Sequence, residues 1–142
     1  MSDSALATAH AFFRAYESHD VEAMLRLCTD DAQLRHVPMG PLETGLVRTV
    51  GRKAWSDIFA ALPDLRVTVT TVVSDDRHIA TETLLSDSNR GFELPQAYFL
   101  TVDETYRITT ITAYWDNVSL GFELTKAGAE RFADVIWHLG RR

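Results

Sequence analysis

The sequence predicts an α+β fold, in which helices pack against a curved and mostly antiparallel sheet. Apolar residues recur at helical spacing in much of the first 62 residues, and four alternating stretches joined by short turns follow between residues 65 and 117. Consecutive strands with short connections pair antiparallel, and strands grouped apart from the helices favour α+β. The 142 residues fit one domain, 1–142.

Three helices are predicted before the main run of strands. Ser4–Ser18 carries one apolar stripe that includes Phe12, Phe13 and Tyr16, and Asp20 is placed to cap a second, short helix over Val21–Cys28. The third helix is Arg52–Leu62, which ends at Pro63. A further helical tail follows Asp116-Asn117, with its apolar stripe in Gly128–Leu139.

Five strands are expected, from a period of two in their apolar residues: Ala32–Val37, Leu65–Ser74, His78–Ser86, Phe92–Val102 and Arg107–Asn117. In the second of these, Leu65, Val67, Val69, Thr71 and Val73 are expected to share one face. Between the first strand and the third helix, Val37–Gly51 is predicted to be a loop rich in Pro and Gly.

The last strand indicates a cavity. Its alternation puts Ile111, Ala113 and Trp115 on one apolar face, which suits the wall of a pocket. His36 lies on the same face of its strand as Leu34, so its imidazole is expected to point into apolar surroundings. The segment Pro41–Val50 is expected to border this pocket and to influence ligand choice.

Composition narrows the possible partners. A net charge of −6, with no cluster of Lys or Arg before the C-terminal pair, offers no attraction for nucleic acid or anionic lipid. The N-terminus lacks the pattern of a signal peptide and no apolar run reaches membrane-spanning length, so a cytoplasmic protein is expected. Cys28 is expected to be a small buried hydrophobe. No histidines stand at metal-ligand spacing and no nucleotide-binding motif is present, so neither a metal nor a cofactor is expected.

Several segments together resemble the nuclear transport factor 2-like superfamily, and within it the SnoaL-like polyketide cyclase group: AFFRAYESHD, VEAMLRLCTDDAQL, HVPMG, GRKAWSDIFAALPDLRVTV and ITAYWDN. The resemblance implies a cone-shaped sheet wrapped around N-terminal helices, with a small hydrophobic ligand inside the cone. It also implies a homodimer formed through the outer face of the sheet. Threonines on that face (Thr68, Thr70, Thr110, Thr112) suit such a contact, and Gly128–Leu139 is expected to close the mouth of the cone or to join the dimer.

The catalytic residues of these relatives are mostly replaced. By resemblance, the base of ketosteroid isomerase falls on His36, and its two oxyanion donors fall on Phe12 and Ala97, whose side chains cannot donate. The essential aspartate of SnoaL-like cyclases falls on Ala113. An isomerase of the ketosteroid type is therefore not expected, because the loss of one oxyanion donor lowers the rate about 10²–10³-fold.

Two candidate catalytic residues remain. His36 is the expected acid/base, with a structural histidine as the alternative, and Tyr16 is a possible hydrogen-bond donor or else a core aromatic. The expected substrate-binding residues are Phe12, Trp55, Phe59, Ala97, Phe99, Ala113 and Trp115. For Asp116, capping of the following helix is preferred over a role as the base.

The expected function is cofactor-free acid/base chemistry, a cyclisation or isomerisation, on a hydrophobic carbonyl-bearing or polyketide-like metabolite. The alternative is a non-catalytic module of the same fold that binds a small molecule or serves dimerisation. The alanine at position 113 favours this alternative, whereas a His36 enclosed in a pocket favours the enzyme.

Overall fold

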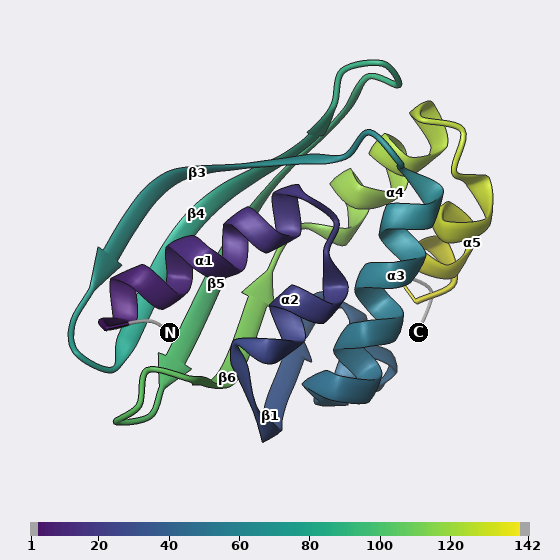
Figure 1. Cartoon of the computed structure of the whole chain (residues 1–142). Coiled ribbons are helices and arrows are strands. Elements are labelled where there is room, and N and C mark those ends of the chain that lie inside the picture. Colours follow the sequence, from purple (N-terminus) through teal and green to yellow (C-terminus); the bar gives the residue numbers. More distant parts are fainter. Residues whose placement is uncertain (1–2, 140–142) are drawn as a thin grey trace.

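The computed structural model describes residues 3–139 and has the predicted α+β architecture. A curved, unclosed sheet of six strands forms its centre (Figure 1). The strands are β1 (Cys28–His36), β2 (Thr44–Leu46), β3 (Arg66–Ser74), β4 (His78–Asp87), β5 (Phe92–Val102) and β6 (Ile108–Tyr114). Their order across the sheet is β2-β1-β6-β5-β4-β3, and all neighbours pair antiparallel except β1 and β6, which run parallel.

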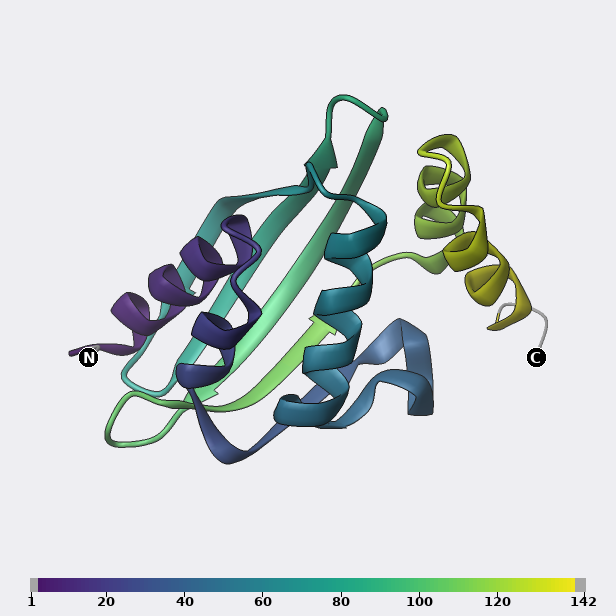
Figure 2. The same cartoon turned by 45° about the vertical axis from the view of Figure 1, so that its right-hand side comes forward.

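Three helices lie along one face of the sheet: α1 (Ala5–Glu17), α2 (Val21–Arg26) and α3 (Arg52–Ala61) (Figure 2). Side-chain caps fix where the first two begin. The Ser4 hydroxyl accepts the N–H of Ala7, and the Asp20 carboxylate accepts that of Ala23, each at 3.0 Å. The predicted cap at Asp20 is therefore confirmed.

The parallel pair of strands positions the site. In the register of β1 and β6, His36 lies opposite Ala113, and both side chains are buried on the face toward the helices. The prediction that His36 shares the buried face with Leu34 is confirmed, as is the burial of Ile111 and Ala113.

One strand departs from the predicted alternation. The pairing of β3 with β4 shifts between Val69 and Thr71, which inserts Thr70 as a bulge. Beyond the bulge the faces exchange, so Val72 is partly buried while Thr71 and Val73 are exposed. The expectation that Thr71 and Val73 share the face of Val67 is therefore wrong.

The segment predicted as the loop Val37–Gly51 is largely ordered into short elements. A 3₁₀ segment, η1 (Val37–Glu43), follows β1, then the chain reverses into β2, and a single π turn, η2 (Val47–Gly51), leads into α3. Because β2 pairs with β1 so that Thr44 lies opposite Arg35, the preceding residue, Glu43, is returned to the end of β1 beside His36.

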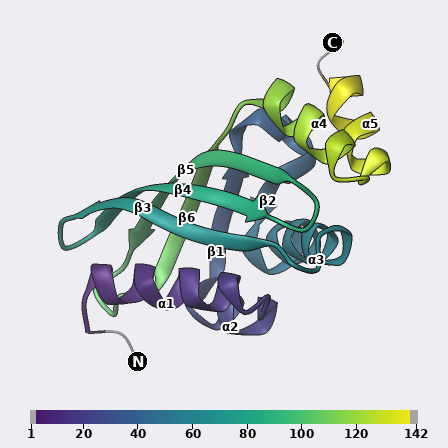
Figure 3. The ribbon, with the colours of Figure 1, turned by 90° about the horizontal axis from the view of Figure 1, so that it is seen from above.

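The C-terminal region forms two helices rather than one, α4 (Asn117–Lys126) and α5 (Glu130–Leu139). Gly128 separates them in the left-handed conformation, with φ +82°. The pair stands at one end of the sheet, beyond α3 (Figure 3). Trp137 of α5 packs directly on Gly121 of α4, where an added Cβ would lie 2.7 Å from the indole. Within residues 3–139, no helix combines the length and apolar character needed to cross a membrane.

Candidate functional site

A cavity of about 80 Å³ lies between the helices and the buried face of the sheet. Its wall is mostly apolar, with a few polar side chains that converge on it from different elements. The polar members are His36 from β1, Glu43 from η1, Gln96 and Tyr98 from β5, and Tyr16 from α1. An apolar pocket with a few convergent polar groups is the usual form of a small-molecule site.

The centre of the site is a pair formed by His36 and Glu43. Nδ1 of His36 lies 2.5 Å from Oε1 of Glu43, and only 5% of the His36 side chain is exposed. A carboxylate can only accept, so the contact assigns the hydrogen to Nδ1, and in this tautomer the lone pair of the ring lies on Nε2. The Trp115 ring packs edge-on against the imidazole, with centroids 5.0 Å apart. The ring is thereby fixed in both tautomer and orientation.

Three buried polar atoms of the cavity lining have no hydrogen-bond partner among the described residues: Nε2 of His36, Nε1 of Trp55 and Oε1 of Gln96. Such an unpaired group destabilises a protein by about 1–3 kcal/mol, so polar atoms of this kind favour an occupant that pairs with them. The indole can only donate, whereas the imidazole nitrogen, in this tautomer, can only accept. Together they suit a molecule that has both an acceptor oxygen and a removable proton.

Tyr16 and Tyr98 add two hydroxyls to the same wall. Burial raises the pKa of Tyr16 well above its usual value, and Tyr98 and Glu43 act in the same direction. Burial also raises the pKa of Tyr98, as does the Glu43 carboxylate, while the Tyr16 hydroxyl and Trp55 indole act in the opposite direction. Both hydroxyls therefore stay protonated at neutral pH and remain donors.

The facing of β5 differs from the expectation. Phe92, Leu94, Gln96 and Tyr98 point into the molecule, whereas Ala97 and Phe99 point outward. Phe99 is 45% exposed and packs against Tyr114 on the outer face. The prediction that Ala97 and Phe99 line the pocket is wrong, because the larger apolar set of β5 faces inward and these two residues lie on the opposite face.

The other expected binding residues divide into two groups. Trp55 and Trp115 line the cavity, as does Tyr16. Phe12 and Phe59 are buried beside it without lining it: Phe12 packs edge-on against Trp55, and Phe59 stacks on the His19 ring. Ala113 belongs to the same group, since it is fully buried in β6 and does not line the cavity as expected. Phe12 and Phe59 thus pack against residues of the cavity wall, Trp55 and Tyr16, without contacting the cavity themselves.

The mouth of the cone is covered by the C-terminal helices. Leu120 and Leu124 of α4, and Phe132 and Ile136 of α5, complete the cavity lining. Two hydrogen bonds of Asn117 hold the start of α4 in place. Its side chain accepts the Trp115 indole N–H at 2.9 Å and donates to the carbonyl of Pro38, in η1, at 2.6 Å. Asp116 caps α4, with its carboxylate accepting the Val118 N–H, as predicted.

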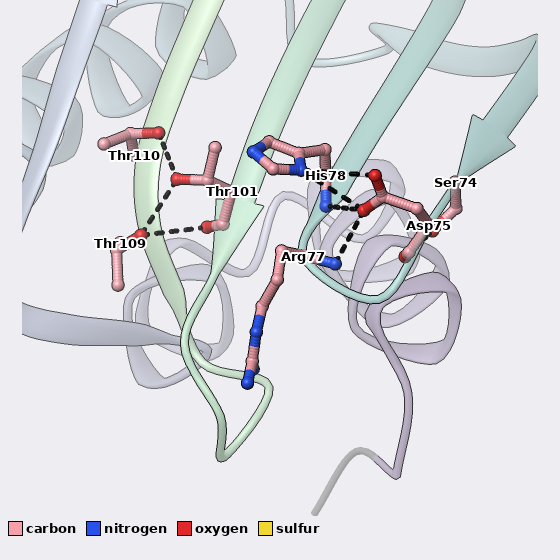
Figure 4. Close-up of polar contacts among 7 residues, drawn as sticks. All are labelled: Ser74, Asp75, Arg77, His78, Thr101, Thr109 and Thr110. Carbon is pink, nitrogen blue, oxygen red and sulfur yellow. Dashed lines mark hydrogen bonds and ion pairs between the residues drawn. The ribbon is translucent and has the colours of Figure 1, made fainter.

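A second polar cluster lies away from the cavity, where β4 begins (Figure 4). Asp75 accepts the backbone N–H groups of Arg77 and His78 at 2.8 Å, and Thr101 is bonded to the Thr109 hydroxyl at 2.9 Å. The Asp75 and His78 side chains are each 70% exposed. The Asp75 contacts close the exposed turn between β3 and β4, and the Thr101–Thr109 contact joins β5 to β6.

Cys28 does not belong to the site. Burial raises the pKa of its thiol to about 12, against the opposing influence of Arg107. Among residues 3–139, no group of three or more His, Cys, Asp or Glu side chains is arranged to hold a metal ion.

Sequence reasoning missed Glu43, Gln96 and Tyr98. Glu43 had no signal, since it follows a Pro- and Gly-containing segment without periodicity. For Gln96 and Tyr98 a weak signal exists, because they alternate in step with Phe92, Leu94 and Leu100 and so lie on the more apolar face of β5.

A curved sheet closed over an apolar cavity by helices defines the cone-shaped class of the nuclear transport factor 2-like proteins. Residues 9–111 match the model of the family described as SnoaL-like domain, and the protein belongs to that family. No protein of curated function matches the sequence.

Solved structures of the same fold include two bacterial proteins and a biosynthetic enzyme. IdmH from Streptomyces antibioticus, a candidate polyketide cyclase, is 22% identical with a TM-score of 0.70, covering 87% of this chain and 98% of its own. RV0760c from Mycobacterium tuberculosis is 21% identical with a TM-score of 0.65, covering 79% and 94%. SalBIII, an epoxide hydrolase/cyclase-like enzyme of pyran ring formation in salinomycin, is 13% identical with a TM-score of 0.68, covering 81% and 92%. At these identities the likeness establishes the fold.

Proposed function

We propose that the protein catalyses cofactor-free proton transfer at a carbon next to the carbonyl group of a hydrophobic metabolite, leading to cyclisation or isomerisation. The observation that carries this proposal is the buried Nε2 of His36, which lines the cavity without a partner among the described residues while Glu43 holds Nδ1. A base that is oriented in this way can remove a proton and return it at another position.

The reaction separates into steps that named side chains can perform. Nε2 of His36 takes the proton, and the imidazolium that forms is stabilised by the Glu43 carboxylate on the other nitrogen. Negative charge then develops on the carbonyl oxygen of the substrate. The Trp55 indole N–H and the Tyr98 hydroxyl line the cavity and can stabilise this charge by donating hydrogen bonds to the oxygen. They would replace the donors that the relatives place at the positions of Phe12 and Ala97.

The neighbours support the same chemistry at the level of the family. IdmH is described as a candidate polyketide cyclase and SalBIII as epoxide hydrolase/cyclase-like, both of the fold found here. The position equivalent to the cyclase aspartate is Ala113, which lies opposite His36 in the sheet. In this chain the proposed proton-transferring group is therefore His36 on β1, the strand next to the one that carries Ala113.

A non-catalytic binding module of the same fold is the second candidate. It is favoured by Ala113, which stands where the cyclases place their essential aspartate. The cavity volume of about 80 Å³, below the roughly 300–1,000 Å³ of typical ligand sites, does not separate the two candidates. A thermal-shift screen separates the two, using aromatic polyketide-like compounds, sterols, terpenoid epoxides and short ketones with wild type and His36→Gln. If the protein is an enzyme, we expect one class of compounds to stabilise both proteins, and we expect wild type to convert these compounds while His36→Gln binds them without converting them. Equal stabilisation without conversion by either protein would establish the binding module.

A further inference from the structure

An apolar groove runs along the outside of the cavity, between η1, η2 and α3 on one side and α5 on the other. Its volume is about 480 Å³, several times that of the cavity. Leu42, Val50 and Val135 line it, and Leu42 and Val135 are 56% and 44% exposed. On α5 the groove-lining residues Phe132, Val135 and Ile136 follow helical spacing, so one face of this helix is turned to the groove.

The groove and the cavity are adjacent and share part of their lining. Five residues border both: Met39, Glu43, Ala54, Phe132 and Ile136. Glu43 is 23% exposed through its side chain and still holds His36, so the boundary between the two spaces lies next to the base. Ala54 of α3 and Phe132 and Ile136 of α5 line both spaces, so a molecule that occupies both passes these side chains.

The charges at the edge of the groove are paired within the protein. Nζ of Lys53 lies 2.5 Å from Oδ2 of Asp57, one helical turn apart, and Glu43 is paired with His36. The remaining lining is apolar apart from Thr49. The groove therefore suits an uncharged hydrocarbon portion rather than an ionic group.

We infer that cavity and groove form a bipartite site for an elongated, uncharged molecule, whose carbonyl end enters the cavity and whose apolar remainder lies in the groove. The identity of the carbonyl end rests on the proposed function, whereas the groove is argued from its own lining. The small cavity then needs to hold only the reacting atoms, and the groove supplies the apolar area that binds the rest. The length of ligand that the protein binds is thus determined by the groove between α5 and the segment Pro41–Val50.

The test is the dependence of affinity on chain length. Binding of 2-alkanones from five to eleven carbons is followed by the fluorescence of Trp55 and Trp115, which line the cavity. We expect the Kd to fall about fourfold per added methylene while the groove fills, and then to level off. Leu42→Ser and Val135→Ser should weaken binding of the long ketones at least about tenfold and leave that of 2-pentanone unchanged. Val73→Ser, a valine 63% exposed on β3, is the matched control and should change nothing.

Primary alcohols of the same lengths, measured in parallel, separate this inference from the proposed function, because they have a tail but no acidic carbon. If alcohols and ketones both show the chain-length series and no ketone exchanges its α-protons, the groove stands and the proposed chemistry falls. If ketones exchange protons while affinity does not depend on chain length, or if Val73→Ser weakens the long ligands as much as Val135→Ser, the bipartite site is overturned. If no member of either series binds, both are overturned.

Discussion

Nδ1 of His36 and Oε1 of Glu43 lie 2.5 Å apart, although one residue ends β1 and the other ends the following 3₁₀ segment. The contact exists because β2 folds back on β1 and returns Glu43 to the end of the strand. It gives a buried imidazole a defined tautomer and places its free nitrogen in the cavity. The chemistry proposed for the protein depends on this pair.

Replacement of the carboxylate tests the pair directly. Glu43→Gln keeps the size of the side chain but can no longer stabilise the imidazolium, so we expect α-proton exchange of a bound ketone to fall at least about tenfold. The rate is measured by NMR as deuterium entry from D₂O. Glu82→Gln, on the exposed face of β4, is the control and should leave the rate unchanged. A Glu43→Gln protein with the wild-type rate would remove Glu43 from the mechanism.

The indole of Trp55 is predicted to bind the ligand oxygen. Trp55→Phe keeps an aromatic ring in the wall and removes the unpartnered N–H, so the Kd for cyclopentanone should rise by up to about tenfold. Methylenecyclopentane, which has the same shape without the oxygen, should bind both proteins alike in calorimetry. Equal losses for the two ligands would mean that Trp55 acts through packing alone.

The two C-terminal helices are predicted to be held together by Gly121. An added methyl group would meet the Trp137 indole at 2.7 Å, and this overpacking should destabilise the protein by about 1–3 kcal/mol in Gly121→Ala. The Tm measured by calorimetry should fall by several degrees. In a Trp137→Leu background the same substitution should have little effect, because the ring that it meets is gone. Additive losses would contradict the contact.

Cys28 is predicted to be unreactive in the folded protein. Its thiol is buried, with a pKa of about 12, so almost no thiolate is present at pH 8. Iodoacetamide labelling, followed by mass spectrometry, should therefore be slow in buffer and should become fast in denaturant at the midpoint of unfolding. Rapid labelling of the native protein would contradict the burial of this strand.

Where the sequence carries a clear period, it predicts the structure. The alternation of Ile111 and Ala113 identifies the buried face of β6 correctly, and the position of His36 beside Leu34 identifies the base candidate. In β5 both faces carry apolar residues, so the alternation gives only a weak signal of facing, and the prediction for Ala97 and Phe99 is wrong. The bulge at Thr70 is likewise invisible, because it depends on pairing with β4 and not on the residues of β3 alone.

The candidate site is only half predictable for the same reason. His36, Tyr16, Trp55 and Trp115 lie on regular elements whose buried faces follow from periodicity. The partner of His36 comes from an irregular segment, and two of the closing side chains, Leu120 and Leu124, come from α4, which the sequence does not separate from the helix expected in Gly128–Leu139. Contacts of that kind arise from tertiary folding, to which local spacing contributes little.

The most direct measurement is deuterium exchange at the carbons next to the carbonyl of 2-heptanone in D₂O, followed by NMR with wild type and His36→Gln. If His36 is the base of an enclosed site, wild type accelerates exchange above the buffer rate, and His36→Gln loses about 10²–10⁴-fold of that acceleration while it still binds the ketone. If 2-heptanone binds and wild type exchanges it no faster than His36→Gln, the cavity binds without proton transfer and the central claim is wrong.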